Sequence, residues 1–458
     1  MDSTSLQAID LFCGWPNPSL LPASALSDAV AAVMANPSIR NPALMYGPDE
    51  GYEPLRQHIA QWLTSYYRPV GPVTASRICI TGGASQNLAC ILQVFSDPSY
   101  TRNVWLVAPT YHLACRMFDD AGFAGRLRAI PQDERGLDLD YLRREMVATE
   151  ERAGDLPPFK PERPWGRLYK HIIYATPTFS NPSTMTMSQS DREDLVRLAR
   201  EFDALVITDD VYDFLQWPSD AEQKLGQHVS AILPRLVDVD RCLDGGPKDE
   251  WGNVVSNGSF SKLIGPGIRT GWAEGTEKVA YGISQTGCQR SGGAPSQFSS
   301  TMVDQLVLSG FLQSYIEEVL RPAYASRYHH MMSAIQTHLL PLGVTIPFAG
   351  TPVVGGYFIW AALPEPLRAS DLAPVALQEH GVKIAAGDLF QVQRDPVASK
   401  NEFGAYLRLC FAWEQEENLA EGVRRLGCAI RQMIEDSGAM TPSSGSTEIE
   451  PWMTGEGK

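Results

Sequence analysis

The sequence lacks cysteines in paired arrangements. Its eight cysteines stand alone at positions 13, 79, 90, 115, 242, 288, 410 and 428, with no CxxC motif and no histidine cluster beside them. Disulfide scaffolds and structural zinc sites need cysteines at short, regular spacings. The pattern therefore indicates no metal site and predicts buried thiols in a reducing compartment, while the length of 458 residues excludes a disulfide-stapled mini-protein.

Long apolar runs and an excess of positive charge are also missing. No stretch approaches the roughly 18 consecutive apolar residues of a membrane-spanning helix, and the first residues, MDSTSLQAID, lack the basic and apolar parts of a leader peptide. Acidic residues outnumber basic ones by 53 to 38, so the electrostatic field of the protein repels polyphosphates and anionic lipids. We expect a cytoplasmic protein that binds neither nucleic acid nor membrane.

The composition that is present, 44% hydrophobic and 20% charged, is that of an ordinary globular protein. Between residues 78 and 275, short β-branched runs alternate with amphipathic patterns, which predicts an α/β fold with a mostly parallel sheet. The expected strands are 77–81, 103–108, 126–130, 170–175, 204–209, 254–259 and 271–275. Helices are expected over 85–95 and 188–203, and the second has Ser190 and Glu193 at capping-box spacing.

The domain organisation follows from changes in this pattern. Residues 1–50 are predicted to form an N-terminal arm and part of a small domain, 51–310 a large domain, and 311–436 a smaller α+β domain that starts with a long helix kinked at Pro322. The Pro- and charge-rich stretch 150–167 is interpreted as a surface insertion. The Ser-, Thr- and Gly-rich tail 437–458 is predicted to be disordered.

The segment SNGSFSKLIGPGIRTGW (256–272) carries the most chemistry. It places Ser259, Ser261, Lys262 and Arg269 in a loop between two expected strands. A lysine amine forms a Schiff base with a carbonyl, and pyridoxal phosphate requires both that bond and a phosphate-binding loop. Taken alone, Ser-x-Ser-Lys is more often a surface lysine beside solvated hydroxyls.

Four other segments provide matching groups. TGGASQNL (81–88) is a Gly-rich turn into a helix, where free backbone N–H groups favour a phosphate. Asp209 ends an expected strand, where open α/β sheets bind ligands, while Asn181 and Tyr111 lie in turns after two others. Individually, each of these groups is more often structural.

In their order and structural context, these motifs resemble the fold-type I pyridoxal-phosphate enzymes, specifically the class I/II aminotransferases. The similarity runs from DLFCGWPNPSLLP (10–22) to YLRLCFAWE (406–414) and is greatest to the aminoadipate and kynurenine aminotransferase branch found in fungi and other eukaryotes. The resemblance implies a large domain with a mixed, mostly parallel seven-stranded sheet, a smaller α+β domain, pyridoxal 5′-phosphate (PLP) as cofactor, and a homodimer with a shared active site.

The resemblance also implies roles for individual residues. Lys262 corresponds to the lysine that forms a Schiff base with PLP and then moves a proton, and Asp209 to the acid that pairs with the pyridine nitrogen. Arg408 corresponds to the clamp for the substrate α-carboxylate. The other implied cofactor contacts are the phosphate ligands Ala84, Ser85, Ser259, Ser261 and Arg269, the O3′ donors Asn181 and Tyr212, and the stacking ring of Tyr111.

Two further sets are implied at the edge of the site. Gly14 and Trp15 correspond to the segment that lines the substrate pocket. Tyr46, Pro295 and Ser296 correspond to residues that reach the active site of the partner subunit.

The chain departs from the family pattern at two places. Thr184 replaces the glycine of the usual NPSG, which predicts a slightly altered turn after Asn181. Gly292 and Gly293 replace bulkier groups, which predicts room opposite Trp15 for a long or aromatic side chain. Arg290 beside them is a candidate for binding a distal substrate carboxylate, although an exposed arginine at the dimer rim is the commoner role.

We therefore predict a PLP-dependent aminotransferase that moves an amino group from a long or aromatic L-amino acid to a 2-oxo acid. A PLP-dependent lyase, cyclase or decarboxylase on the same fold is the alternative, because the fold does not decide between these reactions. A non-catalytic protein that senses PLP or amino acids is a third possibility.

Overall fold

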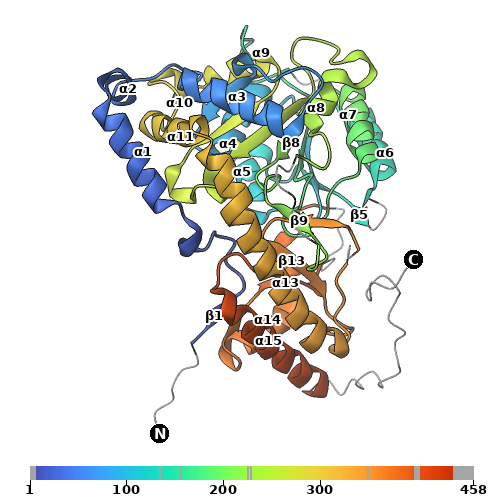
Figure 1. Cartoon of the computed structure of the whole chain (residues 1–458). Coiled ribbons are helices and arrows are strands. Elements are labelled where there is room, and N and C mark those ends of the chain that lie inside the picture. Colours follow the sequence, from blue (N-terminus) through green and yellow to red (C-terminus); the bar gives the residue numbers. More distant parts are fainter. Residues whose placement is uncertain are drawn as a thin grey trace, which may run out of the picture.

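The structure is a computed structural model, and it describes residues 7–133, 136–154, 157–223, 226, 230–347, 350–396 and 403–436. The chain forms a large α/β body and a smaller lobe, which are connected by one long helix (Figure 1). The tail 437–458, for which disorder is predicted, lies outside the described residues.

A seven-stranded sheet forms the centre of the large body. Its order is β2-β11-β10-β8-β7-β3-β4, with β11 antiparallel to both neighbours and all other pairs parallel. All seven strands predicted from the sequence belong to it, because strands that are buried on both faces read as continuous apolar runs. The strands are β2 (Ile78–Thr81), β3 (Asn103–Val107), β4 (Leu127–Ile130), β7 (His171–Ala175), β8 (Ala204–Asp209), β10 (Val254–Ser259) and β11 (Gly271–Glu274).

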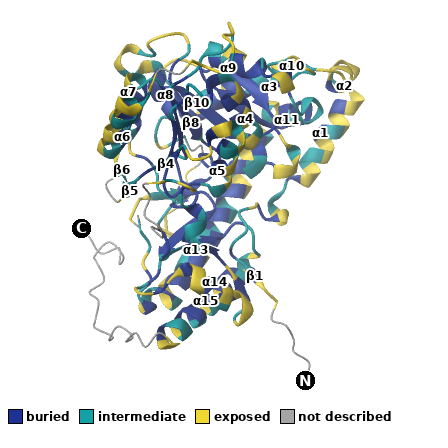
Figure 2. Cartoon of the chain, turned by 180° about the vertical axis from the view of Figure 1, so that it is seen from behind, coloured by how far each residue is buried: buried dark blue, intermediate teal, exposed yellow. Residues whose placement is uncertain are grey.

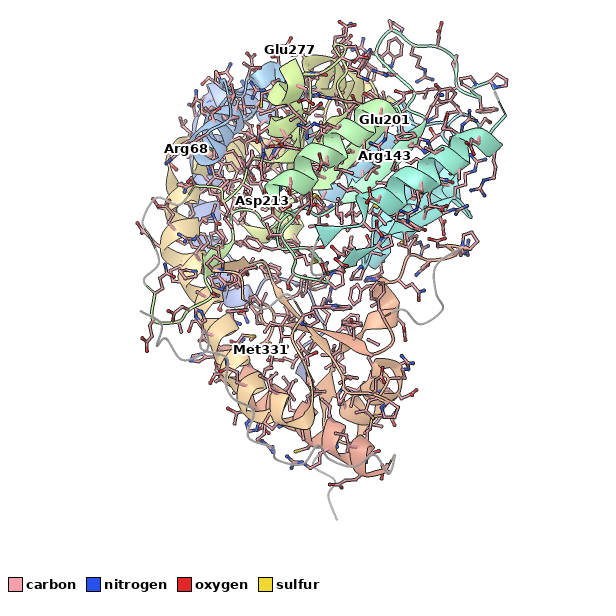
Figure 3. All side chains as sticks on the ribbon, turned by 90° about the vertical axis from the view of Figure 1, so that its right-hand side faces the viewer. Arg68, Arg143, Glu201, Asp213, Glu277 and Met331 are labelled. Carbon is pink, nitrogen blue, oxygen red and sulfur yellow. The ribbon has the colours of Figure 1, made fainter. Side chains whose placement is uncertain are left out.

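Helices cover both faces of this sheet, with their outer sides exposed and their inner sides buried (Figure 2). These helices are α4 (Ala84–Phe95), α5 (His112–Phe118), α6 (Leu139–Arg152), α7 (Gln189–Glu201), α8 (Leu236–Cys242) and α9 (Glu277–Ser284). Arg143 of α6 and Glu201 of α7 point toward each other and form an ion pair (Figure 3).

The predicted cap of α7 is wrong by two residues. Helix α7 begins at Gln189, and its cap is Ser188, whose side chain accepts a hydrogen bond of 3.1 Å from the Asp191 amide. Ser190 lies inside the first turn, where its hydroxyl contacts that of Ser188 at 2.9 Å. Two serines two residues apart give the same sequence signal, and the backbone geometry decides which of them is the cap.

The N-terminal region is divided between the two bodies. Strand β1 (Ile9–Asp10) pairs in parallel with β14 (Val382–Lys383) of the small lobe. The next helices instead pack on the large body around α11. The helices of this layer are α1 (Ala23–Ala35), α2 (Pro37–Ala43), α3 (Glu53–Tyr67), α10 (Gly287–Arg290) and α11 (Gln297–Leu308).

The small lobe is built on a three-stranded antiparallel sheet of order β13-β16-β15. Its strands are β13 (Phe358–Ala362), β15 (Ala385–Ala386) and β16 (Tyr406–Cys410), and its helices are α14 (Ala369–Gln378) and α15 (Glu416–Asp436). Two more strand pairs are short. They are β5 (Gln132–Asp133) with β6 (Gly136–Leu137), and β9 (Gln216–Pro218) with β12 (Val353–Gly355).

The long helix predicted after residue 310 consists of consecutive pieces. Helix α12 (Phe311–Tyr315) passes through a π turn (316–320) into α13 (Arg321–His338), which runs down into the small lobe (Figure 1). Pro322 lies in the first turn of α13, directly after the π turn, which is the part of a helix that tolerates proline.

The stretch interpreted as an insertion follows α6 and has no helix or strand among its described residues beyond Arg152. It is nevertheless attached to the body. The Lys160 ammonium donates to the carbonyls of Leu92 and Gln93 at 3.2 and 2.9 Å, which satisfies acceptors at the C-terminal end of α4. Among the described residues, no helix is long and apolar enough to cross a membrane, and no three metal-ligating side chains cluster.

Candidate active site

Lys262 lies directly after β10, at the edge of the sheet where the parallel strands end. The 3-10 turn Phe260–Lys262 presents its amine toward the N-terminal segment, and Nζ donates to the Gly14 carbonyl at 2.8 Å. Loss of solvent around the ammonium lowers the pKa of Lys262 to about 8. An amine with this pKa is a far better nucleophile and base at neutral pH than an ordinary lysine.

Asp209 is the last residue of β8, and its carboxylate is only half satisfied. Oδ2 accepts from the Tyr174 hydroxyl at 2.9 Å, while Oδ1 is buried and has no hydrogen-bond partner among the described residues. Burial raises the pKa of Asp209 to about 6. An unpaired buried carboxylate oxygen is unfavourable unless a ligand supplies a donor, so Oδ1 fits a protonated ring nitrogen.

Two phenol rings accompany these groups. The buried ring of Tyr212 has its centre 5.8 Å from Lys262 Nζ. Tyr111 is half-buried directly before α5, and burial followed by the charge of Asp209 raises its pKa.

A cradle for an anion surrounds the start of α4. Gly83 precedes the helix with φ +97°, a left-handed conformation that favours glycine, and no side chain of the described residues caps the start of the helix at Ala84 and Ser85. A Cβ at position 83 would come within 3.2 Å of an Arg269 nitrogen. Free N–H groups beside a guanidinium suit a phosphate.

Arg269 and the two serines complete this cradle. Arg269 Nη2 donates to the Gly82 carbonyl at 2.9 Å, which attaches the guanidinium to the turn before α4. The Ser259 hydroxyl donates to that of Ser261 at 3.0 Å. The structure therefore brings together all five predicted phosphate ligands, since β10 and β2 lie on either side of β11.

Arg408 of β16 is buried although it carries a charge. Nη1 donates to Asn181 Oδ1 at 2.8 Å and Nη2 donates to the Phe12 carbonyl at 2.7 Å, while Nε is buried without a partner among the described residues. The guanidinium lies 4.0 Å from the Phe358 ring centre and 4.7 Å from that of Phe390. Desolvation lowers the pKa of Arg408. A buried cation with unused donors fits a carboxylate ligand.

The N-terminal segment covers these groups. A Cβ at Gly14 would lie 2.9 Å from the Phe358 ring and 4.0 Å from Arg408 Nη2, so glycine permits this close approach. Trp15 is 59% exposed and packs edge-on against Trp413, with ring centres 5.7 Å apart. Both residues therefore lie at the rim of the site, and their role in lining the substrate pocket stays a prediction.

Three aromatic residues of the site were not predicted from the sequence. Tyr174 binds Asp209, Phe358 stacks on Arg408, and the Tyr357 hydroxyl donates to the Lys262 carbonyl at 3.1 Å, with its ring 5.1 Å from Lys262 Nζ. GGYFIW (355–360) is recognisable as a strand, but only the pairing of β13 with β16 places it beside Arg408.

Tyr46 does not join this cluster within one chain. Its side chain is 87% exposed. Pro295 and Ser296, which are also predicted to cross to a partner, contact this chain's own cradle: Ser296 donates to the Arg269 carbonyl, and Pro295 faces Gly82.

The structure gives the surroundings of both departures from the family pattern. Thr184 has φ +64°, a left-handed conformation that favours glycine, and the altered turn after Asn181 stays a prediction. Gly292 and Gly293 face the turn at Tyr46 and Gly47, and a Cβ at Gly293 would lie 2.2 Å from the Gly47 carbonyl oxygen. Close packing against that turn therefore explains Gly293, whereas a Cβ at Gly292 would make only an ordinary contact of 3.4 Å with the Tyr46 ring.

Arg290 lies on the surface at the end of α10. It is 68% exposed and forms an ion pair with Asp49. The structure thus gives this guanidinium a partner within its own chain.

Known proteins match this chain over most of its length. The family model for aminotransferase class I and II matches residues 21–426. An uncharacterized Saccharomyces cerevisiae protein is 32% identical and covers 92% of this chain and 97% of its own. The aromatic-amino-acid aminotransferase 1 of Thermococcus litoralis is 28% identical and covers 93% of this chain and 89% of its own.

A solved structure is similar over the same length. The α-aminoadipate aminotransferase LysN of Thermus thermophilus, complexed with N-(5′-phosphopyridoxyl)-L-leucine, has 29% identity and a TM-score of 0.72 and covers 93% of each chain. The fold and the site define a PLP-dependent transferase of the aspartate-aminotransferase-like fold. The chain belongs to the class I and II aminotransferase family, and it is an enzyme that transfers amino groups with PLP.

The residues present fit this cofactor. The amine of Lys262 matches its aldehyde, the unpartnered Oδ1 of Asp209 matches its ring nitrogen, and the uncapped start of α4 with Arg269 matches its phosphate. All three groups lie where the strands of one sheet end.

Proposed function

We propose that Lys262, Asp209 and Arg408 carry out amino-group transfer between a long or aromatic L-amino acid and a 2-oxo acid. One observation carries the proposal: an amine with a pKa of about 8, a buried carboxylate with an unpartnered oxygen and a buried guanidinium with an unused Nε meet at one edge of the sheet.

Lys262 has two tasks in this proposal. PLP, when bound, withdraws electrons from the substrate Cα and holds the amino group between the two half-reactions. Lys262 Nζ would hold the cofactor through its aldehyde, and the same nitrogen, when free, would take the proton from the substrate Cα. The lowered pKa of Lys262 supports both tasks, because each needs the neutral amine.

Asp209 keeps the cofactor ring nitrogen protonated through its free Oδ1, and the Tyr174 hydroxyl holds the carboxylate in place at Oδ2. Tyr212 and Asn181 would hold the phenolic oxygen of the ring by hydrogen bonds, and Tyr111 would hold the ring by stacking. These contacts set how strongly the ring attracts electrons.

Arg408 orients the substrate. Nε and the remaining guanidinium protons bind the α-carboxylate, while Asn181, the Phe12 carbonyl and the Phe358 ring hold the guanidinium in one position. A carboxylate held at two points directs the Cα–H bond toward Lys262.

The preference for long or aromatic donors rests on the rim of the site and on relatives. Trp15 and Trp413 present aromatic surface there, and similar proteins are named as acting on aromatic amino acids and α-aminoadipate. Arg290 is the candidate for a distal carboxylate, which would have to compete with Asp49. Arg290→Ala should raise KM for dicarboxylic donors and leave aromatic donors unchanged; an equal loss for both would contradict this assignment.

The enzyme is proposed to work as a homodimer in the cytoplasm. The exposed run Leu44, Met45 and Tyr46 is an apolar surface of the kind that a partner subunit buries, and it would bring Tyr46 to the partner's phosphate. All eight cysteines are unpaired, as is usual in a reducing compartment. Sedimentation of the wild type and of Met45→Asp tests the dimer.

The central test traps the cofactor covalently. Borohydride reduction of the holoenzyme followed by peptide mapping should find the pyridoxyl group on Lys262, and Lys262→Ala should lose it. Lys278→Ala, a surface lysine paired with Glu250, is the matched control. A pyridoxyl group on another lysine would overturn the site.

A donor screen with 2-oxoglutarate and pyruvate as acceptors tests the reaction type. A new amino acid is the expected product. Release of ammonia instead would move the enzyme to the lyases.

A further inference from the structure

Cys90 and Cys288 lie side by side although 198 residues separate them, and their sulfur atoms are 3.6 Å apart. Cys90 is buried on α4, whereas Cys288 is exposed on the short helix α10. The Thr286 hydroxyl lies 3.7 and 3.6 Å from the two sulfurs. Among the described residues, no other two sulfur atoms are in hydrogen-bond contact.

We propose that Cys90 and Cys288 form a reversible disulfide when a hydroperoxide oxidises the protein. A disulfide needs sulfur atoms about 2.05 Å apart, so the two must approach by roughly 1.5 Å. Helix α10 has one turn and lies at the surface, and therefore Cys288 can make this movement while Cys90 stays in the core.

The order of the two steps follows from accessibility. The Cys288 thiolate attacks the O–O bond of the hydroperoxide: an S–O bond forms, the O–O bond breaks, and the alkoxide leaves and takes up a proton. Cys90 then attacks the Cys288 sulfur, so that the S–S bond forms, the S–O bond breaks and water leaves with the Cys90 proton. One hydroperoxide gains the two electrons that the thiols lose.

Burial supports this division of roles, because it raises the pKa of the Cys90 thiol to about 12. A buried thiol with so little thiolate reacts slowly with an oxidant. Cys90 therefore reacts only in the second step, with the sulfenic acid on Cys288.

The pair is connected to the phosphate cradle through Gln86, and this step rests on the proposed function. Gln86 Nε2 donates to Cys90 Sγ at 2.9 Å and to Cys288 Sγ at 3.7 Å, while its Oε1 accepts from the Gly82 amide at 2.9 Å. Gly82 in turn accepts from Arg269. Moving the sulfurs therefore disturbs the turn on which the cofactor phosphate would rest, and we expect oxidation to speed cofactor dissociation several-fold.

The first experiment maps thiols on the full-length protein after treatment with hydrogen peroxide. Maleimide labelling of the denatured protein should fall from eight thiols to six, a crosslinked peptide should join Cys90 to Cys288, and dithiothreitol should reverse both. Cys288→Ser and Cys90→Ser should each abolish the crosslink. Cys242→Ser, which removes another exposed thiol, should leave it intact.

Several outcomes overturn the site: no crosslink, a crosslink of Cys288 to Cys79 or to a second chain, or sulfinic acid on Cys288 without a crosslink. These results do not depend on whether PLP binds. The second experiment compares PLP release from oxidised and reduced holoenzyme by absorbance. Unchanged release alongside a confirmed crosslink would reject the coupling through Gln86.

Discussion

Replacing Asp209 by asparagine should have opposite effects on the stability of the fold and on the activity with the cofactor. The Asp209 carboxylate is buried with one unpartnered oxygen, and its pKa is raised from the ordinary 3.8 to about 6. That difference corresponds to at most about 3 kcal/mol of unfavourable free energy in the ionised form. The asparagine side chain carries no charge, and its amide oxygen can still accept from Tyr174.

The sign of the pH effect follows from the raised pKa. The folded apoprotein binds the Asp209 proton more tightly than the unfolded chain, so this residue's contribution to stability falls as pH rises from about 3.8 to about 6. Above that window the full cost is present. Asp209→Asn should therefore raise the unfolding midpoint of the apoprotein near neutral pH and lose this advantage as the pH falls through the window.

The same substitution should remove most of the activity, because an amide does not hold the ring nitrogen protonated. The assay is urea unfolding of the apoprotein at several pH values, together with PLP absorbance and kcat/KM of the reconstituted enzyme. Asp28→Asn, an exposed aspartate on α1, is the control and should change neither. Unchanged apoprotein stability would refute the burial argument, and full activity would remove Asp209 from the mechanism.

Three further predictions concern the neighbouring groups. Arg408→Lys keeps the charge but loses Nε and the stack on Phe358. The kcat/KM for amino acids should therefore fall roughly 10- to 150-fold, the equivalent of about 1.5–3 kcal/mol. A similar loss for an amine without a carboxylate would refute the role of Arg408 in binding the α-carboxylate. Lys262, with a pKa of about 8, has roughly 300 times more neutral amine at pH 7 than a lysine of pKa 10.5. The fraction of protein that binds PLP covalently, measured by absorbance, should therefore level off above about pH 8 and not continue to rise toward pH 10. Thr184→Gly should stabilise the protein against urea by about 0.5–1 kcal/mol, because it removes the backbone strain of a β-branched residue at φ +64°, at some cost in unfolded-state entropy. Thr184→Val is the control that keeps the strain. Lower stability of the glycine variant would contradict the strain argument.

The sequence by itself determined the sheet and the ligand-bearing loops. All seven central strands were predictable, because strands buried on both faces leave uninterrupted β-branched runs. Lys262, Asp209 and the turn before α4 were predictable too, since each lies in a local motif next to a predicted strand. Local patterns also led to the cap of α7, but with an error of two residues, because Ser188 and Ser190 give the same signal.

Only the tertiary structure decided which side chains support these groups. Phe358 and Tyr357 reach Arg408 and Lys262 because β13 pairs with β16 in one particular register, and pairing between distant segments leaves no local signal in the sequence. The contact between Cys90 and Cys288 arises in the same way, from the packing of α10 beside α4. The pKa values of Lys262 and Asp209 also belong to the fold, because desolvation depends on what covers a charge and not on its neighbours along the chain.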